Sequence, residues 1–313
     1  ENLTQGLARL AGNRSNEHLI TRFGKDSNAR DLYEEVIYGD KQEDVIPTGL
    51  LTFDEVNGGV IRGSLFTIGG NSGAGKSQLA SSLAVNMASR GYVVVLVPLE
   101  MSEKEMAGRI IANVTKLDSR RIILGKLTEN EKDYAFKKMR QWEKRCAKRG
   151  GSYVIYKPDT DVTIQDVYAV VDAMNPDVCI IDYVTLLAEE ANTDQWKQLG
   201  HVARIGKINA ENNNRVNILL CQVNDDGTIR YSRAINEHSS LSWVFVANAE
   251  TKEQGILPIE QTKARNQDQF PFTLGINYAE SRVYDLKEGG RNEYKVREPD
   301  LGGVQNLAAE SDI

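Results

Sequence analysis

An eight-residue run, Gly70-Asn71-Ser72-Gly73-Ala74-Gly75-Lys76-Ser77, has the spacing of a phosphate-binding loop, G-x-x-x-x-G-K-S/T. Its glycines would let backbone N–H groups close around the β- and γ-phosphates of a nucleotide. Lys76 would add a positive charge, and the hydroxyl of Ser77 is a suitable ligand for Mg²⁺. Gln78, at the start of the expected helix, completes the candidate nucleotide-binding set. The run predicts a binding site for a nucleoside triphosphate with Mg²⁺.

Three polar residues directly follow apolar runs of four residues or more: Glu100, Asp182 and Gln222. Ligands of parallel sheets bind at the carboxyl ends of strands, so these side chains are expected to face the nucleotide. Asp182 would reach the Mg²⁺ beside Ser77. Glu100 would act as a general base that polarises the attacking water, and Gln222 would sense the γ-phosphate. Taken singly, Glu100 and Gln222 also fit strand-end residues that face solvent.

The elements that must position these residues alternate between β and α. Apolar strands are predicted at 65–68, 93–99, 152–156, 178–182 and 216–221, and helices are predicted between them. Two pairs, Ser102 with Glu105 and Thr128 with Glu131, have the capping-box spacing of helix starts. Further β segments follow at 243–246, 256–260, 272–276 and 283–284. This order predicts an α/β fold with a mostly parallel sheet covered by helices on both faces and finished by C-terminal antiparallel strands.

Composition limits the class of protein. The chain has 313 residues, 41% of them hydrophobic, with a formal net charge of −6, which suits one main domain with appendages and argues against a generally basic nucleic-acid binder. A local basic channel remains compatible with this balance. No apolar run approaches the ~20 residues of a membrane span, so no membrane association is expected. The three cysteines lack metal-ligand spacing and the N-terminus lacks a signal-peptide core, which predicts a cytoplasmic protein.

Many of these residues carry a resemblance to DnaB-type replicative helicases that covers most of the chain. The lead-in at 48–65, the run Pro98-Leu99-Glu100-Met101-Ser102 and the pair Asp182-Tyr183 are similar to that family's sequence. In the family these segments precede the phosphate loop, carry the catalytic glutamate and hold the metal-site aspartate. Gln222 resembles the glutamine that ends the next core strand. The resemblance implies a RecA-like P-loop NTPase fold that binds ATP and Mg²⁺.

A later segment, Ile229–Ile235, resembles a loop that grips DNA in the central channel of these helicases. Tyr231 stands where the family has glutamate, and Arg233 stands where it has glycine, so the segment is more basic and bulkier than the family pattern. The resemblance implies contacts with single-stranded DNA from Arg230, Ser232 and Arg233.

The segment Thr262-Lys263-Ala264-Arg265-Asn266 resembles the family's Lys-x-Arg-Asn motif. In that family the arginine is a finger that completes the ATP site of the neighbouring subunit. The resemblance therefore implies that Lys263 and Arg265 act in trans. Gln267 stands where glycine is usual in the family.

As a whole, the resemblance implies an ATP-dependent ring motor, expected to be a homo-hexamer, that translocates on single-stranded DNA and unwinds duplex DNA. A primase and a helicase loader would be its partners. The alternatives are a RecA-like recombinase and another RecA-family ATPase without unwinding activity. The Lys-x-Arg-Asn motif favours the ring helicase, and the basic segment around Arg230 argues against a purely regulatory ATPase.

Three regions are expected along the chain. Residues 1–45 form an N-terminal linker with a short amphipathic docking helix at 29–38, residues 46–286 form the RecA-like ATPase domain, and residues 287–313 form a flexible polar tail. Because only about 45 residues precede the ATPase domain, the family's primase-interacting domain is expected to be missing. The chain is then either the C-terminal half of such a helicase or a shorter, phage-encoded relative.

Overall fold

The computed structural model describes Arg30, Ile37 and residues 44–159, 162–182, 184, 187, 195–223 and 232–286, without the side chains of 195, 196 and 232–234. The chain divides into two compact units, Glu1–Asp44 and Val45–Ile313, and every labelled helix and strand lies in the second. The expected tail at 287–313 and all but two residues of the expected docking helix lie outside the described residues. The three proposed regions therefore remain predictions.

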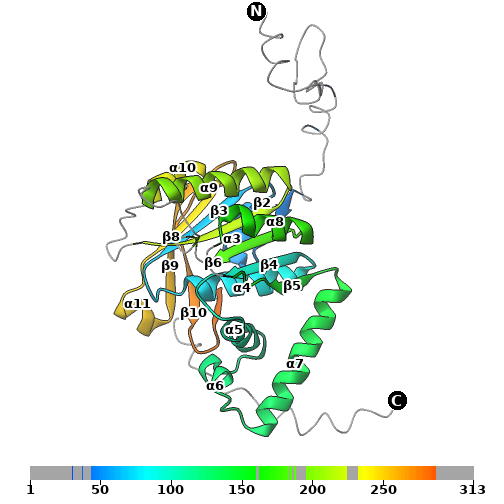
Figure 1. Cartoon of the computed structure of the whole chain (residues 1–313). Helices are drawn as coiled ribbons and strands as arrows, with labels where there is room; N and C mark the ends of the chain where they lie inside the picture. The colour runs from blue at the N-terminus through cyan, green and yellow to red at the C-terminus, as the bar shows by residue number, and fades with distance from the viewer. Residues whose placement is uncertain are drawn as a thin grey trace, which may run out of the picture. The chain divides into compact units, whose positions relative to one another are not determined.

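A nine-stranded sheet forms the centre of the second unit, in the order β11-β10-β9-β8-β3-β7-β6-β4-β5 (Figure 1). Its strands are β3 Leu65–Gly70, β4 Val93–Pro98, β5 Ser152–Ile155, β6 Val178–Asp182, β7 Val216–Gln222, β8 Leu241–Phe245, β9 Ile256–Ala264, β10 Phe272–Asn277 and β11 Arg282–Asp285. The strands from β8 to β5 are parallel, and β9, β10 and β11 pair antiparallel. The predicted α/β fold with a mostly parallel sheet is confirmed.

Helices cover both faces of this sheet (Figure 1). They are α3 Leu51–Asn57, α4 Lys76–Arg90, α5 Glu103–Thr115, α6 Ser119–Ile123, α7 Glu129–Lys148, α8 Ile164–Met174, α9 Gln195–Asn212, α10 Ser232–His238 and α11 Ala249–Gln254. A separate two-stranded antiparallel sheet of β1 Val45–Ile46 and β2 Val60–Ile61, connected through α3, precedes β3. Both predicted capping boxes are present, at Ser102 and at Thr128, and a third begins α8 at Thr163. Among the described residues, no helix has the length and apolarity needed to cross a bilayer.

The side chains of β3 alternate between two buried apolar clusters. Phe66 belongs to the cluster that includes the apolar residues of α4, and Leu65 belongs to the cluster that includes those of α8 and α9. Successive residues of a strand point to opposite faces, so a fully apolar strand must be covered on both sides. This explains why the central strands carry continuous apolar runs.

The strand β8 differs from the predicted arrangement. The sequence pattern places the segment at 243–246 among the antiparallel strands, but β8 pairs parallel with β3 and antiparallel only with β9. The connection from β7 includes α10 and returns the chain to the edge of the sheet where β3 begins, as parallel pairing requires. Trp243 of β8 is fully buried and meets Phe53, Phe66 and Phe272 edge-on, with ring centroids 4.7–5.1 Å apart. These edge-on ring contacts stabilise the packing of β8 against the core.

Candidate nucleotide-binding site

The carboxyl ends of four neighbouring strands bring the candidate site residues to one edge of the sheet. Gly70 at the end of β3 pairs with Gln222 at the end of β7, and Pro98 of β4 pairs with Asp182 at the end of β6. Glu100 follows β4 by two residues, and its side chain is exposed. The sequence-predicted residues at 70–78, 100, 182 and 222 therefore share one edge, as expected for a parallel sheet.

The phosphate-loop segment is shaped by left-handed glycines. Gly73 has φ 66° and Gly75 has φ 106°, a region that side chains other than glycine rarely adopt. A Cβ at Gly75 would lie 2.5 Å from Ile276 Cδ1, so even alanine would not fit without movement. The α4 helix begins immediately afterwards at Lys76, which places its free N–H groups beside the loop. This is a cradle of the kind that binds phosphate groups.

The side chain of Asn71 anchors the loop to the segment after β8. Its Nδ2 donates to the carbonyl of Ala247 at 3.1 Å, and its Oδ1 accepts from the Ala247 N–H at 3.0 Å. On the other side, the hydroxyl of Tyr278 donates to the Ala74 carbonyl at 3.3 Å. The loop is thus held by segments 176 and 204 residues away along the chain. Such fixed backbone geometry is what preorganised phosphate binding requires.

Lys76 folds back onto the loop that precedes it. Its Nζ donates to the carbonyl of Gly70 at 2.7 Å and to that of Asn71 at 3.0 Å. Burial lowers the pKa of the ammonium group, while the neighbouring groups Cys221, Asp182 and Glu100 raise it. The ammonium group is therefore held at the mouth of the cradle by neutral carbonyls that a phosphate oxygen can replace.

Asp182 is 4% exposed and interacts with the hydroxyl of Ser77. Burial raises the pKa of this carboxyl group, and the hydrogen bond from Ser77 and the nearby charges of Arg109 and Lys76 lower it. A buried carboxylate next to a hydroxyl is a donor set of the type that Mg²⁺ prefers. The residue types and their proximity therefore fit a divalent cation at this point.

The structure adds a residue that was not predicted from the sequence, Arg109 of α5. Burial lowers the pKa of its guanidinium group, while the charges of Asp182, Glu105 and Glu100 raise it. Its Nη1 is buried and makes no hydrogen bond with any residue that the structure describes. A signal was present in the sequence, because Arg109 lies four residues after Glu105 and between the apolar residues that α5 buries. A positively charged side chain on the buried face of a helix is usually paired with a negatively charged group.

Lys263 and Arg265 lie at the opposite end of the sheet from the phosphate loop. Lys263 pairs with Ser242 near the start of β8, and the N–H of Arg265 donates to the carbonyl of Ser240 at 2.8 Å. Both side chains donate to the last turn of α10. Lys263 Nζ bonds the carbonyls of residues 236 and 237, the latter at 3.0 Å, and Arg265 Nη2 bonds that of residue 237 at 3.2 Å. Neither residue is brought to the candidate site of its own chain.

The predicted DNA-contacting residues are only partly within the described chain. Arg230 lies outside the described residues, and so do the side chains of Ser232 and Arg233, whose backbone begins α10. Their proposed contacts with DNA remain a prediction. Gln222 is exposed at the end of β7, next to the phosphate loop.

Residues 45–234 match the family model of the DnaB-like helicase C-terminal domain. The chain belongs to this family. The match begins at β1 and ends within α10, so it includes the phosphate-loop segment, Glu100, Asp182 and Gln222. Membership of the DnaB-like family, which the sequence motifs suggested, is confirmed.

One curated relative and three solved structures support this assignment at the level of sequence or fold. A probable replicative DNA helicase of Guillardia theta is 26% identical over 250 residues, which span 77% of this chain but only 37% of that protein. A solved structure described as an ATPase domain superimposes with a TM-score of 0.70 at 20% identity, covering 82% of this chain and 96% of that domain.

A DnaB-like replicative helicase, described with its interactions with primase, gives a TM-score of 0.69 at 18% identity and covers 84% of this chain and 69% of that one. The RadB recombinase is more distant, with a TM-score of 0.51 at 15% identity over 78% of this chain and all of the RadB chain. These structural likenesses show that the DnaB-like domain has the expected RecA-like fold.

Proposed function

We propose that this DnaB-like domain is the ATP-dependent motor of a replicative DNA helicase, which translocates on single-stranded DNA and unwinds duplex DNA. The observation that carries the proposal is the meeting of Lys76, Ser77, Asp182 and Glu100 at one sheet edge, in a chain of the DnaB-like family. The loop supplies the cradle, and the strand ends supply the carboxylates that phosphoryl transfer requires.

In this proposal, the N–H groups of the loop and of the first turn of α4 bind the β- and γ-phosphates of ATP. Residues 70–78 form this nucleotide-binding set, and Lys76 exchanges its two carbonyl partners for phosphate oxygens. Ser77 and Asp182 would hold Mg²⁺, which when bound neutralises charge on the phosphates. The raised pKa of Asp182 supports this role, because a buried carboxylate without a cation is unfavourable.

Glu100 is proposed to accept a proton from the water that attacks the γ-phosphate. Its carboxylate is exposed at the carboxyl end of β4, yet close enough to Lys76, Asp182 and Arg109 for their charges to interact. Arg109 would orient the two carboxylates, since its buried guanidinium group lies near both and keeps an unused donor. This arrangement allows a water to be held between a general base and the phosphate.

Lys263 and Arg265 are proposed to complete the ATP site of a neighbouring subunit. Their distance from the loop of their own chain supports action in trans, and this implies a homo-oligomeric ring, which we expect to be hexameric. Hydrolysis would remove the γ-phosphate that connects two subunits, and the segment carrying Arg230, Ser232 and Arg233 would then move along single-stranded DNA. Gln222 would report the presence of the γ-phosphate from the adjacent strand end.

A recombinase-like activity is the second candidate, because the RadB recombinase shares the fold. The family match favours the helicase. Primase and a helicase loader are proposed as partners by analogy. The solved DnaB-like helicase with primase interactions has the same fold as this domain, and this likeness is the basis of the analogy.

The proposal is tested by measuring ATP hydrolysis with and without single-stranded DNA, together with strand separation on a forked duplex. We expect DNA-stimulated hydrolysis, ATP-dependent strand separation and ring-shaped particles by electron microscopy. The Lys76→Ala chain is the control and should lose both activities. Hydrolysis without strand separation, with filaments on DNA in place of rings, would support the recombinase class instead.

A further inference from the structure

A polar pocket lies beside the last turns of α4, whereas the nucleotide site lies at the first turn of that helix. It has a volume of about 350 Å³ and lies where α4, α5, α7, β11 and the turn before α3 meet. Its lining includes none of the residues 70–78, and neither Glu100 nor Asp182. The size is that of a small-molecule site and exceeds that of a single ordered water. This pocket has no part in the proposed ATP chemistry.

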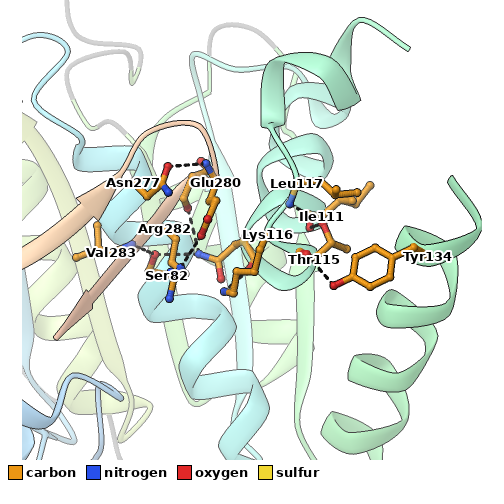
Figure 2. A network of polar contacts seen from close by, with 12 residues as sticks. Ser82, Ile111, Thr115, Lys116, Leu117, Tyr134, Asn277, Glu280, Arg282 and Val283 are labelled. Atoms are coloured by element: carbon orange, nitrogen blue, oxygen red, sulfur yellow. Dashed lines mark hydrogen bonds and ion pairs between the residues drawn. The ribbon is translucent and has the colours of Figure 1, made fainter. Parts of the chain in front are cut away.

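Hydrogen bonds between the surrounding elements fix the walls of the pocket. The side chain of Asn113 in α5 donates to Ser82 Oγ of α4 at 3.0 Å and to the carbonyl of Ser281 before β11 at 3.1 Å. Across the pocket, Trp142 Nε1 of α7 donates to Ser89 Oγ of α4 at 2.8 Å. Figure 2 shows the surroundings of Ser82 in α4, with Lys116, Glu280 and Arg282 labelled in the same view. These hydrogen bonds connect the elements that line the pocket.

Positive charge dominates the lining. Lys116, Arg145 and Arg282 line the pocket together with one carboxylate, Asp285. Asp285 is already committed, because its two oxygens accept from the N–H groups of Leu51 and Thr52 at the start of α3, each at 2.8 Å. The positive charge of the pocket is thus only partly compensated among the described residues.

The three cations retain hydrogen-bond donors that the described residues do not use. Arg282 bonds Glu280 through Nε at 3.0 Å and stacks on Tyr284, which leaves both terminal NH₂ groups of its guanidinium. Lys116 uses one donor on the carbonyl of Asn113 at 2.5 Å. Among the described residues, Arg145 has no hydrogen bond or ion pair. Guanidinium groups match the geometry of phosphate oxygens. Because Glu280 and Asp285 offset two of the three positive charges, one positive charge remains to attract an anion.

We propose that this pocket is a binding site for a small phosphate-bearing anion, held by Lys116, Arg145 and Arg282. A phosphate ester or pyrophosphate has the size, the charge and the acceptors that the three side chains require. The site is separate from the phosphate loop, so its occupancy does not depend on the proposed ATPase function.

The ionisation of Lys116 supplies an independent readout. Burial and the neighbouring charge of Arg282 lower the pKa of Lys116 to about 8, while Glu280 raises it. Arg145 is the charged group that faces the pocket from α7. An anion binds the protonated form better, so binding should raise this pKa and weaken as the pH rises above 8. A lysine in free solution would show no such change in this range.

The test is titration calorimetry with pyrophosphate on the full chain carrying Lys76→Ala, which disables the phosphate loop. We expect one saturable site at low salt, weakened on the order of tenfold or more by each of Lys116→Gln and Arg145→Gln. Arg140→Gln is the matched control, because Arg140 lies on α7 but packs over Phe136 outside the pocket. The affinity of the Arg140→Gln chain for pyrophosphate should equal that of the chain with Arg140.

The same titration at pH 7 and pH 9 distinguishes specific binding in the pocket from nonspecific electrostatic attraction of pyrophosphate to basic residues. Between these values the chain with Lys116 should lose up to about tenfold more affinity than the Lys116→Arg chain, whose charge does not titrate. The titration of pyrophosphate itself is common to both chains and cancels. No saturable binding, equal weakening by Arg140→Gln, or equal pH dependence with lysine and arginine at position 116 would overturn the proposal.

Discussion

Lys76 and Arg265 lie beside opposite ends of β8. Lys76 bonds the carbonyl of Gly70, which pairs with Phe245 at the carboxyl end of β8, whereas the N–H of Arg265 bonds the carbonyl of Ser240 just before the strand begins. At about 3.3 Å per residue, the five steps from Ser240 to Phe245 span roughly 16 Å along the sheet. An arginine at that distance cannot contact a phosphate held by its own loop.

The first prediction follows from this separation: Arg265→Ala should bind nucleotide but lose most of its turnover, since arginine fingers supply roughly 10³-fold or more in rate. Mixing Arg265→Ala with Lys76→Ala should restore part of the activity, because some interfaces would then pair an intact loop with an intact arginine. Steady-state ATPase assays on the pure and mixed chains measure both effects.

Arg265 also bonds the last turn of α10, so a structural role must be separated from a catalytic one. Arg265→Lys keeps a donor for that carbonyl and should preserve thermal stability while turnover stays low. Full ATPase activity of pure Arg265→Ala would refute action in trans.

The second prediction concerns the lysine of the loop. Lys76→Ala should abolish ATP hydrolysis while the chain stays folded, because Lys76 is the first residue of α4 and alanine is compatible with a helix. The hydrogen bonds lost are those from Lys76 Nζ to the carbonyls of Gly70 and Asn71. Lys104→Ala, which removes an exposed lysine from α5, is the control and should keep the parent rate. Parent-level turnover by Lys76→Ala would show that the nucleotide site is elsewhere.

The third prediction tests the proposed general base. Glu100→Gln should bind ATP with little change and hydrolyse it on the order of 10²-fold more slowly or worse, since the amide cannot accept the proton of the attacking water. Glu103→Gln, three residues further on and also exposed, should behave like the parent chain. Filter binding and single-turnover hydrolysis separate the two quantities, and equal losses in both would indicate a structural role for Glu100.

The fourth prediction concerns Arg109. If its guanidinium group orients Asp182 and Glu100, Arg109→Gln should lower kcat more than it raises KM for ATP, by on the order of tenfold or more. Arg109→Lys should recover only part of the loss, because an ammonium group cannot serve two carboxylates in a fixed plane. An unchanged kcat in Arg109→Gln would show that Arg109 does not orient the two carboxylates and contributes only to packing.

The fifth prediction is a pH dependence of stability. Hydrogen bonds from Arg121 and Thr128 lower the pKa of Glu131 from 4.5 to about 2. The group therefore contributes stability above pH 4.5, and this contribution is lost as the pH falls from 4.5 towards 2. Glu131→Gln should lower the melting temperature at pH 7, and the difference from the parent chain should vanish near pH 2.

Glu129→Gln on the same helix is the control for this measurement. Its side chain is 85% exposed and, within the described part of the chain, pairs only with Lys132 across one turn, so its removal should change stability little. A melting-temperature difference for Glu131→Gln that persists unchanged to pH 2 would contradict the assignment of the effect to its ionised form.

Local patterns in the sequence determined much of what the structure contains. The phosphate-loop run, the polar residues after apolar strands and the two capping boxes each depend on residues within a few positions of one another. Backbone conformation and helix starts respond to such near neighbours, so these features could be predicted. The alternation of strands and helices then implied that Glu100, Asp182 and Gln222 share one edge.

Other features depended on contacts between distant segments, and only the tertiary structure decided them. Parallel pairing places β8 beside β3, about 175 residues away, and no local signal distinguishes a parallel from an antiparallel apolar strand. The position of Arg109 near Asp182 and the separation of Arg265 from its own loop follow from that packing. The cationic pocket likewise joins residues from 49 to 285, because side chains far apart in sequence meet only once the sheet and its helices are assembled.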